Sequence, residues 1–274
     1  MVKNILLCFL LIFGGGKLTA QSYKALITEG LEAVQNNKLT DAERIFKKAL
    51  KLDPSNVRNG MIFSNLGTVQ RRLGKRDEAI ESYSLAINLL PYSVSSRLDR
   101  ASLYMEKNLL DKAYIDYCNV IDLDRTNEEA LLYRAYIYMQ QRKYNEARAD
   151  YDLLLQENPK HKSARLGLAL LLQKEARYKE ALDEYATLMT NYPDDASILK
   201  ARVYLEMEMQ AIDLAMLDLE TLQMLVPEDA EIYVMRGDIL LLQEKKKEAR
   251  TAFEKAIRLG FPRPNLHYRI KACK

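Results

Sequence analysis

The sequence predicts an all-α fold, a solenoid of seven antiparallel helical hairpins followed by a capping helix. Two observations predict it. Alanine recurs with a first gap of 37 residues and five further gaps of 34, at Ala42, Ala79, Ala113, Ala147, Ala181, Ala215 and Ala249. A large ring or Leu follows each alanine by four residues, and Gly or Ala precedes six of the seven by twelve. A fixed period of this length is typical of repeat arrays.

Each repeat is expected to be a pair of helices. In residues 131–141, Leu131, Ala135 and Tyr138 lie at helical spacing, and residues 147–155 keep the same rhythm. The polar residues 142–145 separate the two stretches and predict a short turn. Proline follows the second helix in five repeats, where it marks the helix end. The small residue lets the two helix backbones approach each other.

The motif Leu131-Leu132-Tyr133-Arg134-Ala135-Tyr136, followed by Ala147, Tyr151 and Pro159, resembles a tetratricopeptide repeat. The resemblance covers residues 23 to about 263 and departs from the family at the first-helix Trp, because the chain has no Trp. It implies a right-handed superhelical solenoid over residues 21–263. The expected repeats lie at approximately 23–56, 60–93, 94–127, 128–161, 162–195, 196–229 and 230–263.

Residues 264–274 are expected to form a C-terminal capping helix. Leu266, Ile270 and Cys273 make its apolar stripe, which would cover the exposed face of the last repeat. The alternative is that this segment docks on a partner.

The N-terminus has the order of a cleavable secretory signal peptide. Lys3 precedes an apolar run over residues 5–13, and a site of small residues ends at Ala20. Nine apolar residues rise about 14 Å as a helix, which is short of a hydrocarbon core of about 30 Å. We therefore expect a signal peptide over residues 1–20 and an exported, periplasmic protein of bacterial type without stable membrane insertion. The alternative is a cytoplasmic protein with a disordered or core-packed N-terminus.

Charge and motifs argue against nucleic acid as a partner and against catalysis. Removal of Lys3 and Lys17 with the signal peptide lowers the formal net charge from +3 to +1, which predicts no strong field toward nucleic acid or an anionic membrane. His161 and His267 belong to no metal-binding or nucleophile motif. We expect no enzyme activity and no catalytic, cofactor-binding or metal site.

Arginine and aspartate recur together across the hairpins. Arginine stands thirteen residues before the alanine at Arg100, Arg134, Arg202 and Arg236, and aspartate stands three residues after it at Asp116, Asp150 and Asp218. This pattern predicts ion pairs that join the two helices of a hairpin, or neighbouring hairpins. The alternative is a row of arginines that bind a ligand.

The resemblance implies that the first helices line a concave groove. The groove positions lie fifteen, eleven and eight residues before each alanine, and the candidate peptide-binding residues are Leu132, Tyr136, Met139, Leu166, Leu170, Tyr204 and Met207. Exposed apolar surface of this kind typically marks a binding site. The alternative is a tight groove in which these side chains pack on one another.

The sequence therefore favours a non-enzymatic scaffold that binds a peptide segment or helix of a protein partner. The family's charged clamp for a C-terminal carboxylate is missing, because Ile27, Ser64 and Leu98 occupy corresponding places. The second hypothesis is a self-associating structural component of a cell-envelope or secretion assembly. The oligomeric state stays open.

Overall fold

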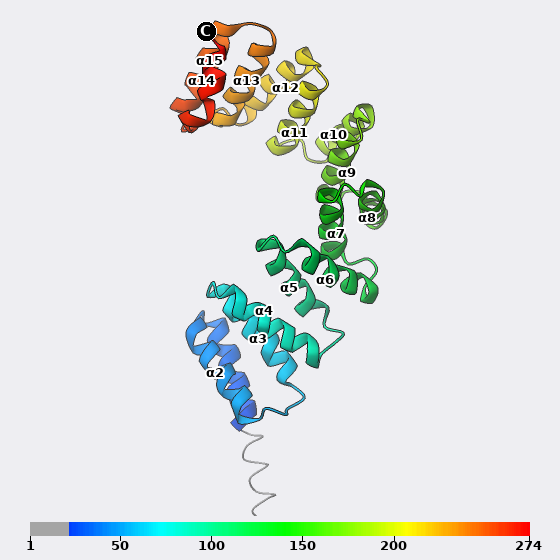
Figure 1. Cartoon of the computed structure of the whole chain (residues 1–274), viewed down its shortest axis with the longest axis vertical. Helices are drawn as coiled ribbons and strands as arrows, with labels where there is room; N and C mark the ends of the chain where they lie inside the picture. Colours follow the sequence, from blue (N-terminus) through cyan, green and yellow to red (C-terminus); the bar gives the residue numbers. More distant parts are fainter. Residues whose placement is uncertain (1–21) are drawn as a thin grey trace, which may run out of the picture. The chain divides into compact units, whose positions relative to one another are not determined.

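The structure, a computed structural model, describes residues 22–274, which are helical and contain no strand (Figure 1). The predicted signal peptide lies outside the described residues. A helix over residues 22–35 is followed by α2 (Leu39–Leu52), α3 (Asn59–Arg72), α4 (Arg76–Leu89), α5 (Val94–Glu106), α6 (Leu110–Leu123), α7 (Glu128–Gln140), α8 (Tyr144–Glu157), α9 (Lys162–Lys174), α10 (Tyr178–Asn191), α11 (Ala196–Glu208), α12 (Ile212–Leu225), α13 (Ala230–Leu242), α14 (Lys246–Arg258), η1 (Arg263–Leu266) and α15 (His267–Ala272).

The chain consists of two compact units, one ending at Ile137 and the other beginning at Tyr138. Within the first unit α3 packs on α4 and α5 on α6, and within the second α9 packs on α10, α11 on α12 and α13 on α14. Each pair is a hairpin, and the second helices α4, α10 and α12 also pack on the first helix of the next hairpin. The predicted all-α architecture of paired helices is confirmed.

The recurring small and large residues form the core of each hairpin. All seven alanines of the period are completely buried, and the ring or Leu four residues later is at most 4% exposed in each repeat. At Gly30 and Gly237 a Cβ atom would lie 2.5 and 2.3 Å from the rings of Phe46 and Phe253. Glycine therefore stands where the ring lies against the backbone of the first helix.

A residue in the left-handed conformation ends the first helix of every hairpin. It lies five residues before the alanine and has φ between 56° and 77°, at Asn37, Gly74, Asn108, Arg142, Ala176, Gln210 and Glu244. The N–H of the next residue donates to a carbonyl five residues back, as from Lys143 to Tyr138 at 2.9 Å. This geometry is a Schellman cap, and it reverses the chain within three residues.

Side-chain caps begin several of the first helices. Ser93, His161, Asp195 and Asp229 each accept a hydrogen bond from a backbone N–H two or three residues later, at 2.9–3.3 Å. These bonds satisfy N–H groups that have no partner inside the helix. His161 therefore has a structural role, since its Nδ1 accepts from Ala164.

The C-terminal segment differs from the single helix expected over residues 264–274. A 3₁₀ turn, η1, precedes the six-residue helix α15. Pro262 and Pro264 explain the difference, because their fixed φ and missing N–H groups delay the regular helix. Leu266 is completely buried and Cys273 is 9% exposed, and both pack with Phe253.

Candidate functional site

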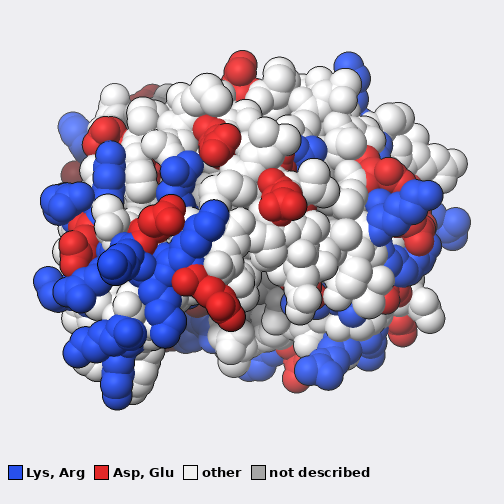
Figure 2. Space-filling view, turned by 90° about the horizontal axis from the view of Figure 1, so that it is seen from above, with Lys and Arg blue, Asp and Glu red and all other residues white. Residues whose placement is uncertain are grey.

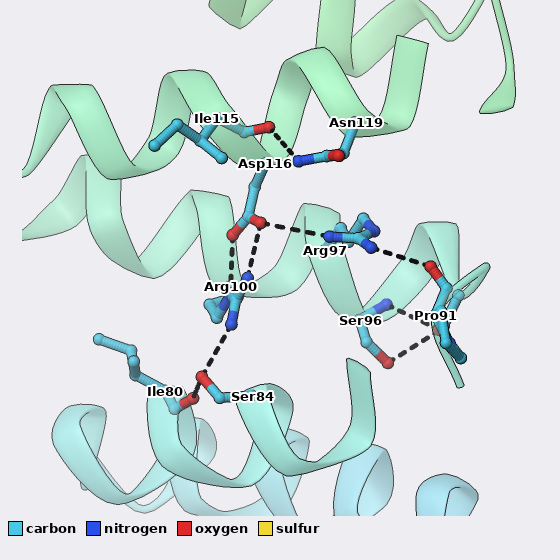
Figure 3. Close-up of polar contacts among 10 residues, drawn as sticks. Ile80, Ser84, Pro91, Ser96, Arg97, Arg100, Ile115, Asp116 and Asn119 are labelled. Atoms are coloured by element: carbon cyan, nitrogen blue, oxygen red, sulfur yellow. Dashed lines mark hydrogen bonds and ion pairs between the residues drawn. The ribbon is translucent and has the colours of Figure 1, made fainter. Parts of the chain in front are cut away.

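The arginine of the third repeat joins three helices (Figure 3). Arg100 on α5 donates from Nε and Nη2 to the Asp116 carboxylate on α6, at 2.8 and 2.7 Å. Its Nη1 donates to Ser84 Oγ on α4, at 2.9 Å. Asp116 is 1% exposed, and Arg97 Nη1 lies 3.8 Å from it. The predicted structural ion pair is confirmed here, and it joins neighbouring hairpins as well as the two helices of one.

Other repeats vary the same arrangement. Arg202 on α11 donates twice to Asp218 on α12, at 2.5 and 2.6 Å. Arg134 Nη1 donates to Cys118 Sγ at 3.8 Å, which is the register of the Arg100–Ser84 contact. The specific expectation that Arg134 pairs with Asp150 stays a prediction. These contacts tie Arg100, Arg134 and Arg202 to other helices and argue against a row of ligand-binding guanidinium groups at these three repeats.

The fifth repeat has an ion pair that the pattern missed. Leu168 replaces the usual arginine, and Arg165 Nη1 instead donates to Glu184 at 2.5 Å. Arg165 Nη2 also donates to the Pro159 carbonyl at 2.7 Å. An arginine sixteen residues before the alanine is the sequence feature that could have revealed this substitute.

The seven predicted groove residues divide into two groups by exposure. Tyr136, Leu170 and Tyr204 are exposed, at 46%, 44% and 45%. The other four are partly buried, namely Leu132, Met139, Leu166 and Met207. The three exposed residues all stand eleven residues before the alanine, in consecutive repeats. Position eleven is therefore the exposed position in these repeats, while the predicted residues at positions fifteen and eight are partly buried.

Polar groups fix the surroundings of Tyr204 in the second unit. Its hydroxyl donates to Glu231 Oε1 at 3.0 Å, and Lys200 Nζ donates to Asp229 and Glu231, both at 2.7 Å. Burial, with the hydrogen bond to Glu231, raises the pKa of Tyr204 to about 12. The phenol therefore stays protonated at neutral pH and presents an oriented ring.

The first unit has a polar network on its first helices that sequence reasoning missed. Arg71 Nη2 donates to Ser102 Oγ and to Glu106 Oε1, both at 2.8 Å. Arg71 Nη1 lies 3.7 Å from Asp99, whose pKa is raised by burial. Gln173 and Glu208 repeat the Arg71–Glu106 spacing of 35 residues, at 2.5 Å. The sequence signal that could have revealed this network is a polar residue eight positions before the alanine of one repeat, combined with a Glu seven positions before the alanine of the next repeat.

An aromatic stack lies beside this network. The Tyr117 and Tyr133 rings are stacked with centroids 5.6 Å apart and an interplanar angle of 12°. Tyr117 is completely buried and its hydroxyl has no hydrogen-bond partner within the described part of the chain, while Tyr133 is 40% exposed. Burial raises the pKa of Tyr117. The buried Tyr117 ring on α6 therefore supports the Tyr133 ring on α7, which is the accessible one of the two.

The described residues contain no group of three or more His, Cys, Asp or Glu placed to hold a metal ion. In the same part of the chain, no helix has the length and apolar character needed to cross a membrane. The site residues are side chains of a surface, and their chemistry is that of contact, hydrogen bonding and charge.

Comparisons with known proteins decide the family. Tetratricopeptide repeat models match residues 27–94, 138–203 and 230–259. The solved structure of a tetratricopeptide repeat protein from Parabacteroides merdae is 33% identical, with a TM-score of 0.73 over 92% of this chain and 99% of that one. The chain belongs to the tetratricopeptide repeat family. Tetratricopeptide repeat proteins of this kind are protein-interaction scaffolds.

Curated relatives share only part of their length with this tetratricopeptide repeat protein. Human DnaJ homolog subfamily C member 7 is 32% identical over 110 residues, which is 40% of this chain and 22% of that protein. Human mitochondrial import receptor subunit TOM34 is 26% identical over 110 residues, which is 38% of this chain and 35% of that protein. The chain thus spans about a fifth to a third of these relatives.

Proposed function

We propose that this tetratricopeptide repeat protein is a non-enzymatic scaffold that binds a peptide segment or helix of a protein partner through its first helices. The observation that carries the proposal is that one register position is 44–46% exposed in both units, at Tyr136 in the first and at Leu170 and Tyr204 in the second. Large apolar side chains on a solvated surface favour a binding role, because a partner that covers them removes apolar surface from water and so stabilises the complex.

The chemistry around Tyr204 favours a mixed partner surface. A ring contributes a large contact area at a small cost in side-chain entropy. Glu231 bonds to the Tyr204 hydroxyl, and Glu208 bonds to Gln173, which lies three residues after Leu170 on α9. A partner segment with apolar anchors and flanking polar or basic groups fits this surface.

We also propose that the protein is exported and works in a periplasm, on the basis of the basic, apolar and small-residue order of residues 1–20. Mass spectrometry of protein from its native host should find an N-terminus at Gln21. An intact Met1 would exclude cleavage and would favour the alternative of a cytoplasmic protein.

The functional test replaces two of the three exposed residues. Tyr136→Ala with Tyr204→Ala should leave helix content unchanged, because the core residues of the hairpins stay in place. The affinity for a partner isolated with the wild-type chain should fall by about 2 kcal/mol or more, which is roughly 30-fold. Lys48→Ala, on the exposed side of α2, is the control and should bind as the wild type does. If the double variant binds the partner as tightly as the wild type does, the binding surface lies elsewhere on the protein.

A second function, self-association, is favoured by the outer face of α12. Leu214, Leu217 and Met224 are 51%, 61% and 79% exposed at helical spacing. Such a stripe matches the seam between two packed helices. Leu217→Lys should convert an oligomer to a monomer in light scattering if this face joins copies. A wild-type monomer at high concentration would exclude this function.

A further inference from the structure

Basic side chains are concentrated at one end of the sequence. Residues 245–274 contain ten Lys and Arg and only two acidic residues, Glu248 and Glu254. The other 244 residues contain 31 basic and 36 acidic residues, so the net charge of +3 combines an acidic majority with a basic C-terminal segment. Figure 2 shows Lys and Arg gathered on the left of the view from above, with some Asp and Glu among them.

A pocket of about 670 Å³ lies within this segment. Its lining residues come from α14, η1 and α15, and they are Arg250, Arg263, Pro264, His267, Ile270, Lys271 and Lys274. None of these seven described residues is acidic. The core contacts of Leu266 and Cys273 hold the lining segment on α14, so the pocket is part of the folded repeat array. We call these residues the C-terminal basic pocket.

The positive charge of the pocket is largely uncompensated. Arg250 Nε is 3.0 Å from Glu254 Oε1, and the side chains of this surface pair are about half exposed. Within the described residues, Arg263 and Lys271 make no ion pair with a carboxylate. Like charges that converge on one pocket repel each other and attract an anion. The ligand that relieves this repulsion carries negative charge.

The rim of the pocket indicates which anion it meets. Tyr268 is 84% exposed and adjoins His267, with their ring centroids 5.5 Å apart. An exposed aromatic ring among Lys and Arg is typical of residues that lie at the headgroup level of a membrane. A nucleic acid would extend beyond the pocket along a chain whose remainder is net acidic. A layer of lipid headgroups instead needs to contact only the residues of this pocket.

We propose that the C-terminal basic pocket binds the phosphate of anionic phospholipid headgroups and docks the protein on a membrane surface. Arg250 and Arg263 present planar guanidinium groups that match phosphate oxygens, and Lys271 and Lys274 add point charges. Tyr268 enters the interface beside them. This contact is peripheral, and it is separate from the partner surface on the first helices.

The test uses the full mature chain and vesicles of stated composition. The chain should sediment with vesicles of phosphatidylcholine and phosphatidylglycerol, and should stay in solution with phosphatidylcholine alone. Arg263→Gln with Lys271→Gln should reduce the partition coefficient about 30-fold, given the usual contribution of a basic residue at an anionic surface. Lys48→Gln with Lys51→Gln removes the same charge from α2 and should change it less than twofold. Melting curves establish that each variant is folded.

Three results would overturn the proposal. The first is equal sedimentation of the wild type with neutral and anionic vesicles. The second is equal binding by the pocket variant and the wild type. The third is full displacement from anionic vesicles by millimolar inorganic phosphate or by a DNA oligonucleotide, which would assign the pocket to a free phosphate or to nucleic acid. Tyr268→Ala should weaken vesicle binding several-fold, and an unchanged partition would contradict insertion of the ring.

Discussion

Glu206 should make the stability of the sixth repeat depend on pH. This residue on α11 is 4% exposed, and its Oε2 has no hydrogen-bond partner among residues 22–274. Its Oε1 lies 3.8 Å from Arg202 Nε, but the Arg202 guanidinium donates both of its short bonds to Asp218. Burial, reinforced by the negative charge of Asp218, raises the pKa of Glu206 to about 7.

The direction of the effect follows from proton binding. Between the unfolded pKa of 4.5 and the folded value of about 7, the folded chain holds a proton on Glu206 that the unfolded chain has lost. This carboxyl therefore lowers stability progressively as the pH rises through that window, and the loss is complete above pH 7. A shift of this size corresponds to roughly 3 kcal/mol at about 1.4 kcal/mol per pKa unit.

Glu206→Gln tests this reasoning, because the amide has a similar shape and stays neutral. The variant should resist urea more strongly than the wild type at pH 8, by up to roughly 3 kcal/mol, and should differ little at pH 4.5. Glu208→Gln, an exposed neighbour on α11, is the control. The same difference between Glu206→Gln and wild type at both pH values would refute the raised pKa.

Two further substitutions test the packing described above. Asp116→Asn should lower the free energy of unfolding, measured by urea titration, by about 3 kcal/mol, because Arg100 and Arg97 lose a carboxylate that is 1% exposed. The control is Asp41→Asn, in an ion pair whose side chains are more than half exposed, and it should cost less than about 0.5 kcal/mol. Ala176→Gly should stabilise the fifth hairpin by about 0.5–1 kcal/mol, because φ is 58° there and glycine removes the Cβ strain. Asn108→Gly, at φ 56°, should gain less, and a loss of stability at Ala176 would show that the turn tolerates its Cβ without strain.

The period predicted the hairpins because their packing depends on residue size at fixed positions. Ala147 and its six counterparts are completely buried, so a larger residue at any of them would separate two helices. The Arg100–Asp116 pair was predictable for a related reason, since an isolated buried charge is costly and its partner must recur with it.

The left-handed backbone conformation within the turns could not be predicted in the same way. Arg142, Ala176 and Glu244 adopt φ values of 58–60°, although these residue types do not favour the left-handed region. The packing of the flanking helices imposes this conformation, and the Schellman bonds stabilise it. Only Gly74 and the two asparagines carry a local signal for it. The capping segment shows the opposite case, since Pro262 and Pro264 override the apolar periodicity.

The candidate partner surface was predictable only as a face of the first helices. Helical spacing placed Tyr136, Leu170 and Tyr204 on one register, and their exposure agrees with that placement. The Arg71 network escaped notice because its contacts join residues 31 and 35 apart, in neighbouring repeats, where period alone gives no pairing. Contacts between repeats depend on helix crossing, which a sequence pattern does not specify.

The net charge of the whole chain was a poor guide to the charge of its individual segments. In a globular domain distant segments fold together and their charges mix, but a solenoid brings together only neighbouring repeats. The acidic majority of residues 1–244 therefore reaches the ten basic residues of the last segment only from neighbouring elements, as where Arg269 on α15 pairs with Asp238 on α13 at 2.7 Å. For such a chain, charge has to be counted repeat by repeat. On that count the last hairpin and α15 form a distinct electrostatic surface, which can meet an anionic layer while the first helices of other repeats stay available to a protein partner.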